Sequence, residues 1–69
     1  MAKLEIVMSG VSVEYECEEV DAKRVANTFE AYLSEGVSPR LKMGLTRRGE
    51  RSGVIVIDFS KVVAVRFGL

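Results

Sequence analysis

The sequence predicts a small α+β domain of order β-β-α-β-β-β, with a single helix packed on one face of an antiparallel sheet. Three patterns predict it: two alternating segments around a glycine turn, one stretch with helical spacing, and β-branched runs near the C-terminal end. The 69 residues form one domain, 1–69, because no proline- or glycine-rich linker divides them.

Residues 3–8 and 11–18 predict a hairpin, because apolar and polar side chains alternate in both. Ser9-Gly10 supplies a tight turn in which the glycine takes a left-handed conformation. The resulting register puts all paired apolar residues on one face: Met8 with Val11, Ile6 with Val13, and Leu4 with Tyr15.

A helix follows over residues 22–35, with Asp21 as its expected N-cap and Gly36 as its stop. The apolar positions recur at the i, i+4, i+7 and i+8 spacing of a helix packed on one face. They are Val25, Phe29, Tyr32 and Leu33.

Three more strands complete the sheet. Apolar and polar side chains alternate over residues 41–46, which predicts a strand, and residues 47–53 (RRGERSG) predict an exposed basic loop. Residues 54–59 and 62–67 are rich in β-branched side chains and predict two strands, joined by a tight turn over 58–61. The last two strands are apolar on both faces. A single helix can cover only one face of a sheet, so the other apolar face needs another partner.

The second apolar face leaves two alternatives: the sheet curls into a partial barrel, or a second copy of the chain covers the face. We expect the second copy, because a core of this size is marginal and neither a disulfide nor a zinc site can support it. The residues expected at that oligomer interface are Val54, Val56, Val62, Ala64 and Arg66.

Charge is divided unevenly along the chain. Residues 1–36 hold 3 basic and 8 acidic groups, whereas residues 37–69 hold 7 basic and 2 acidic groups. This division predicts either an anionic partner for the basic half or contact between the two halves, within one chain or between copies. The candidate anion- or nucleic-acid-binding residues are Arg40, Lys42, Arg47, Arg48 and Arg51.

Other polar or reactive residues have ordinary structural interpretations. Glu14, Glu16 and Glu18 are too widely spaced along a strand to share one cation, so we expect a solvated or partner-facing surface. Cys17 falls on the inward face and is expected to be a buried, unreactive thiol. Asp58 is expected to close a turn through backbone amides two or three residues on.

The composition excludes several function classes. The chain has no histidine and one cysteine, so it lacks a catalytic triad, the usual zinc ligands and an intrachain disulfide; no metal or cofactor is predicted. No segment is long and apolar enough to span a membrane, no secretory leader is recognisable, and we expect a cytoplasmic protein without a membrane partner.

We therefore expect a homo-oligomeric binding protein that presents a surface or pocket between subunits to a protein or a small anionic ligand. A nucleic-acid-binding regulator that uses the basic C-terminal half is the alternative. An enzyme with a site between subunits is the third hypothesis, with no catalytic residue assigned.

Overall fold

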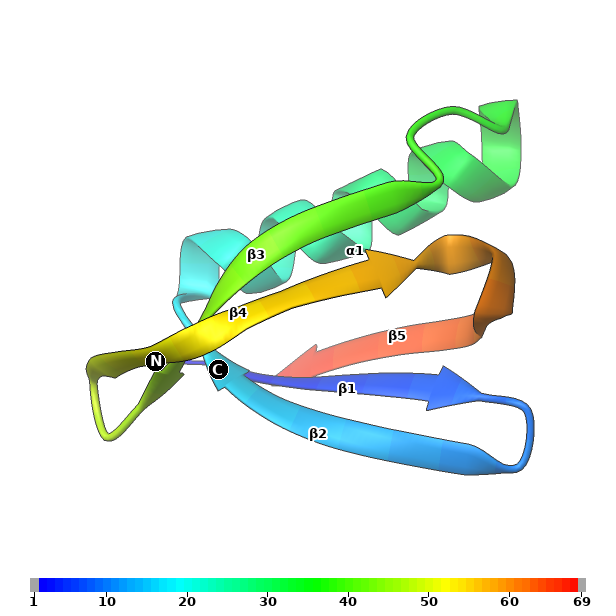
Figure 1. The fold of residues 1–69 in the computed structure, drawn as a ribbon. Coiled ribbons are helices and arrows are strands. Elements are labelled where there is room, and N and C mark those ends of the chain that lie inside the picture. Colours follow the sequence, from blue (N-terminus) through cyan, green and yellow to red (C-terminus); the bar gives the residue numbers. More distant parts are fainter. Residues whose placement is uncertain (1, 69) are drawn as a thin grey trace.

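A computed structural model describes residues 2–68, and it confirms the predicted class and the order of the elements. The five strands are antiparallel and one long helix accompanies them (Figure 1). The elements are β1 (Ala2–Met8), β2 (Val11–Cys17), α1 (Glu19–Glu35), β3 (Arg40–Arg47), β4 (Glu50–Asp58), the 3-10 turn η1 (Phe59–Lys61) and β5 (Val62–Gly68).

The strands form two sheets, rather than the single sheet that the sequence predicts. Sheet A has the order β2-β1-β5 and sheet B consists of β3 and β4; the two do not close into a barrel. Both β3 and α1 contact sheet A, α1 over β1 and β5 and β3 over β2. Figure 1 shows the helix and β3 running side by side above sheet A.

The predicted register of the first hairpin is confirmed, from Met8 opposite Val11 to Leu4 opposite Tyr15. Gly10 takes the expected left-handed conformation, with φ 78°. Strand β1 is central, because β5 pairs with its other edge. A β-bulge on β5 interrupts this second ladder: Met8 faces Val62 and Val7 faces Ala64, which leaves Val63 as the extra residue.

Helix α1 begins at Glu19, three residues before the predicted start. Its N-cap is Glu18, whose side chain makes no capping hydrogen bond, so the expectation that Asp21 caps the helix is wrong. Asp21 instead lies in the first turn, where its negative carboxylate interacts favourably with the positive end of the helix dipole. It also forms an ion pair with Arg24 at 3.5 Å. Gly36 ends the helix as predicted: its φ is 71° and its N–H donates to the Tyr32 carbonyl.

The basic loop predicted over 47–53 is much shorter in the structure. Strand β3 continues to Arg47 and β4 begins at Glu50, so only Arg48 and Gly49 form the turn. Both take positive φ, 54° and 83°, which is the type I′ geometry that matches the twist of a hairpin. The other five residues of the predicted loop therefore extend the two strands, with a bulge at Ser52, because Leu45 faces Gly53 and Thr46 faces Arg51.

The tight hairpin predicted between 54–59 and 62–67 is wrong, because β4 pairs with β3 and β5 pairs with β1. Asp58 does close a turn as predicted: its Oδ1 accepts from the Ser60 N–H at 3.0 Å and from Ser60 Oγ at 2.7 Å. That turn is η1, which buries Phe59 and lets its N–H donate to the Pro39 carbonyl at 2.8 Å. The chain thus leaves sheet B at Phe59 and enters sheet A.

The core lies between the two sheets and the helix. Leu4 and Ile6 of β1 meet Val25 and Phe29 of α1, and Phe59 packs its ring 5.4 Å from that of Phe29 and 6.1 Å from that of Tyr32. Tyr32 is half-buried against this core, whereas Leu33, predicted on the same side of the helix, is 66% exposed.

Candidate functional site

The outer face of sheet B leaves two apolar side chains exposed side by side. Alternation along β4 directs Ile55 and Ile57 inward and Val54 and Val56 outward, where these two valines are 54% and 62% exposed. Their neighbours on β3 are Gly44 and Lys42, which offer little apolar cover. Two exposed valines on the same face of a strand form a small apolar patch that can contact another molecule.

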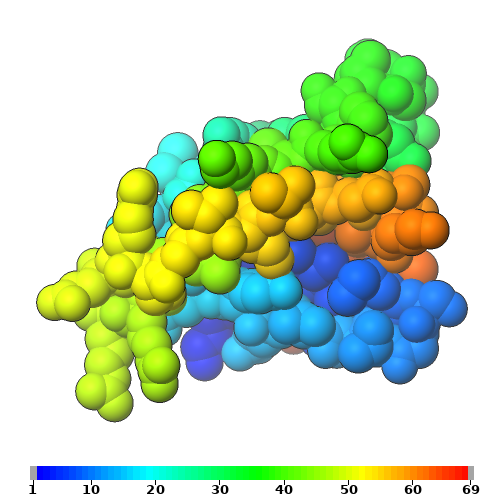
Figure 2. Space-filling model, in the orientation of Figure 1, coloured from blue at the N-terminus to red at the C-terminus, as the bar shows by residue number. Residues whose placement is uncertain are grey.

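Strand β4 also has an unpaired edge. It is the last strand of sheet B, and within residues 2–68 no strand pairs with its other side. An unpaired edge presents backbone N–H and C=O groups that can add another strand. In Figure 2 the atoms of β4, coloured yellow to orange, lie on the surface turned to the reader, above those of the β1–β2 hairpin in blue.

A shallow apolar groove of about 230 Å³ lies beneath this edge. Its walls come from both sheets, with Asp58 and Lys61 at the side. The remaining residues that line it are Ile6, Met8, Tyr15, Ile55, Val56, Ile57 and Val62. The sequence pattern places Met8 and Tyr15 inward but gives no sign that they border a groove, because the groove exists only once two sheets face each other.

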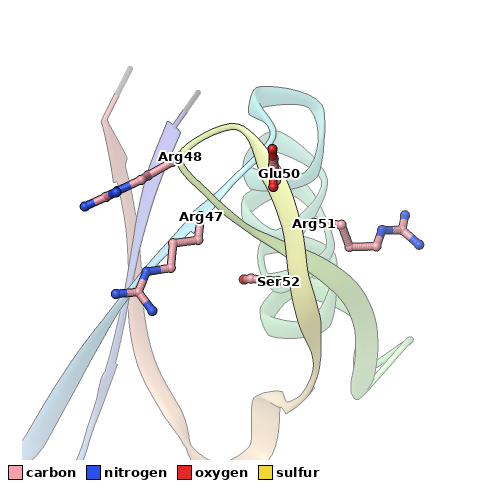
Figure 3. Close-up of a pocket in the computed structure, with 5 residues that line it drawn as sticks. All are labelled: Arg47, Arg48, Glu50, Arg51 and Ser52. Atoms are coloured by element: carbon pink, nitrogen blue, oxygen red, sulfur yellow. The ribbon is translucent and has the colours of Figure 1, made fainter.

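The three arginines of the β3–β4 turn do not converge on one point. Figure 3 shows Arg47 and Arg48 directed to one side of the hairpin and Arg51 to the other. The open depression that they border, of about 490 Å³, also contains Glu50 and Ser52. A fork of arginines on one phosphate, which the sequence suggests, is therefore not preformed at this turn.

The turn instead contacts the acidic half of the same chain. The backbone N–H of Arg48 donates to Glu16 Oε1 of β2 at 2.7 Å. This hydrogen bond joins the tip of sheet B to the edge of sheet A. It is a contact within one chain between the basic and acidic halves of the sequence. The contact uses the main chain, so the guanidinium group of Arg48 is not needed for it.

Three of the five predicted basic residues share the outer face of sheet B. Arg40, Lys42 and Arg51 lie on this face by register, and the guanidinium group of Arg51 lies over Gly44, with Nη2 3.8 Å from where a Cβ would stand. Gly44 thus leaves room for an arginine across the strand. On the other side of β3, Arg24 of the helix donates to the Lys42 carbonyl at 3.0 Å and covers part of that edge.

The five predicted interface residues lie on different surfaces. Val54 and Val56 are on the outer face of sheet B, Ala64 and Arg66 are on the outer face of sheet A, and Val62 points toward the groove. The bulge on β5 explains part of this division, because it shifts the alternation and leaves Val63 66% exposed. Val54 and Val56 lie on β4 beside its unpaired edge, and Val56 and Val62 line the groove.

The outer face of sheet A is charged with both signs. Glu5 lies between Glu14 of β2 and Arg66 of β5, and Lys3 Nζ is 4.0 Å from Glu14 Oε1. Both groups of that ion pair are well exposed, so solvent screens it. Within the described residues, no group of three or more Asp, Glu, Cys or His side chains is placed to hold a metal ion.

Cys17 is buried at the end of β2, as predicted. Burial, together with the nearby charges of Asp21 and Glu18, raises the pKa of its thiol, which disfavours the reactive thiolate. Among the described residues, no helix has the length and apolar character needed to cross a membrane.

The geometry of these surfaces suits recognition: an apolar pair of valines, an unpaired strand edge, a groove beneath it and basic side chains on the same face. No protein-family model, curated protein or solved structure matches the chain.

Proposed function

We propose that this chain is a small cytoplasmic binding protein that works as a homo-oligomer and presents a surface between its subunits to a protein or a small anionic ligand. The observation that carries the proposal is the pair of exposed valines, Val54 and Val56, beside the unpaired edge of β4. A monomer would leave this edge open to any other extended chain, which natural proteins avoid.

The size of the core supports the same proposal. A chain of 69 residues buries about 60% of the surface that its unfolded form exposes. The one cysteine is free and buried, so no disulfide adds to this core. Association of copies is the remaining common way to bury more apolar surface.

The charges on sheet B support an anionic ligand. Arg40, Lys42 and Arg51 would stand around the valines on the same face, and a second copy would double their number. Arginine and lysine at such a rim attract carboxylate or phosphate groups and raise association rates, with a dependence on ionic strength.

The test is native mass spectrometry of the untagged protein, together with light scattering over a range of concentrations. The proposal predicts a discrete multiple of the 7.6 kDa chain. A monomer at every concentration, from the micromolar to the millimolar range, contradicts it. Any extra mass bound per subunit or per interface identifies the class of ligand.

Nucleic-acid binding is the second candidate function, and the shared face of Arg40, Lys42 and Arg51 is the observation that favours it. Binding driven by phosphates falls log-linearly as salt rises. A fluorescence-anisotropy titration with mixed DNA and RNA oligonucleotides at low salt tests it, with the triple variant R40E/K42E/R51E as the comparison. Absence of binding at low salt, or equal binding by the triple variant, contradicts this candidate.

A further inference from the structure

We infer that the partner of β4 is β4 of a second copy, paired antiparallel about a two-fold axis at Ile55, so that the two sheets B become one four-stranded sheet. This inference rests on the proposed function, because it specifies the interface of the proposed homo-oligomer. It assigns one strand to the interface and one register to that strand.

The first support is the apolar pattern on β4. A two-fold axis at Ile55 places Val54 of each copy opposite Val56 of the other, so that four valines meet on the outer face. Directly opposite side chains in an antiparallel pair lie about 4.5–5.5 Å apart at Cβ, which allows full contact between two valines. An axis at Val56 would instead put Val54 opposite Asp58, and lose both of these apolar pairs.

The second support is charge. With the axis at Ile55, Asp58 faces Ser52 of the other copy, a neutral residue that does not repel its carboxylate. Oδ1 of Asp58 accepts from Ser60, which leaves Oδ2 for the Ser52 hydroxyl of the other copy. An axis at Val54 would set Asp58 against Glu50, two like charges directly opposite each other.

The third support is area. A stable protein interface buries about 800 Å² of accessible surface on each partner. A nine-residue strand is about 30 Å long at ~3.4 Å per residue, while the molecule measures 34 × 24 × 20 Å, so the β4 edge runs much of the length of one face. The strand edge alone is narrower than such an interface, and the adjoining groove with Met8, Tyr15 and Val62 supplies the additional apolar surface.

The disrupting variant is V54K/V56K, which places four lysines where the four valines would meet. We expect the dimer dissociation constant to rise by about tenfold or more, because like charges then stand opposite each other at a strand edge. The control is V63K, at an equally exposed valine on sheet A, which leaves the constant unchanged. Circular dichroism verifies that both variants are folded, as expected for substitutions at exposed positions.

Cysteine cross-linking tests the register without altering charge. Under mild oxidation, V54C mixed with V56C gives the mixed cross-linked dimer, because these positions lie opposite each other. V54C alone and V56C alone cross-link much less, because each residue then meets its own copy only diagonally, at about 7–8 Å. V63C is the exposed control, and Cys17 is buried and unchanged in every variant.

The outcomes separate the two proposals. If the chain is monomeric at all concentrations, the proposed function fails and the inference fails with it. If the chain self-associates but V54K/V56K associates as tightly as V63K, β4 is not the interface and only the inference fails. If V54C or V56C cross-links with itself faster than the mixture does, the axis is not at Ile55 and the inference is again overturned.

Discussion

Hairpin β1–β2 and hairpin β3–β4 both direct alternating apolar side chains into one shared core, yet their outer faces differ in kind. The first carries charges of both signs, and β1 has a strand on each side. The second carries Val54 and Val56, and β4 has a strand on one side only. A hairpin whose outer face is charged can end a sheet safely, whereas one with valines beside a free edge invites another strand.

The largest effect is expected where the two hairpins share their core. Phe59 is fully buried between them and packs on Phe29 and Tyr32, so F59A should cost about 3–5 kcal/mol, close to all the stability that a core of this size provides. Urea denaturation followed by circular dichroism measures the loss, with the half-buried Phe67 as the comparison in F67A. A loss below about 1 kcal/mol would mean that the hairpins are stabilised separately.

The two turns should respond to substitution with opposite signs. Gly10 has φ 78° and open space around it, so G10A costs about 1 kcal/mol from backbone strain alone. Arg48 already carries such strain at φ 54°, so R48N, which creates the Asn-Gly pair preferred in this turn, should gain about 0.5–1 kcal/mol. Thermal unfolding of both variants measures the two shifts; a loss for R48N would contradict the type I′ turn.

The hydrogen bond between the hairpins predicts a smaller change. E16A removes the acceptor of the Arg48 N–H and should cost about 1 kcal/mol, since the carboxylate is only partly buried. Hydrogen exchange at the Arg48 amide should become faster in the variant. E14A is the matched control, two residues away on the same strand, and should leave that amide unchanged; equal rates in both variants would show that the turn does not rest on Glu16.

The smallest effect concerns pH at the point where the chain changes sheets. Hydrogen bonds from the Ser60 side chain and backbone, with Arg40 and Lys61 nearby, hold the pKa of Asp58 below its usual range. The ionised form is thus favoured in the folded state. Its contribution to folding stability is present above about pH 4 and is lost as the pH falls through the lowered pKa of Asp58. D58N should unfold more easily than the parent chain at pH 7, and this difference should shrink at pH 3. A difference of equal size at both pH values would contradict the cause given for the shift.

Local patterns predicted the elements well, and long-range pairing escaped them. The alternation around Ser9-Gly10 fixed the register of β1 and β2, because a turn with two residues leaves one pairing that keeps the apolar side chains together. The segment 54–67 looked like a hairpin because both of its strands are apolar on both faces, although a buried Phe59 carries the chain from one sheet to the other.

The candidate site was predicted in part. Val54 and Val56 were expected at an interface and do adjoin a free edge, whereas Ala64 and Arg66 lie on the other sheet. They lie there because β5 pairs with β1 and not with β4. The bulge at Val63 further separates Val62 from Ala64, because one extra residue reverses the alternation and no residue type in the sequence signals it. Likewise, the spread of Arg47, Arg48 and Arg51 follows from the positive φ angles of a two-residue turn, which a loop of seven residues would not impose.

The central position of β1 has a consequence for synthesis on the ribosome. Lys3 pairs with Gly68, so β1 acquires its second neighbour only after β5 has been synthesised. Until then the β1–β2 hairpin lacks β5 and exposes Leu4 and Ile6, which later become core. Such distant pairings form slowly, because a long loop must close first. The charged outer face of that hairpin would then keep nascent chains apart during the one period in which their apolar face is uncovered.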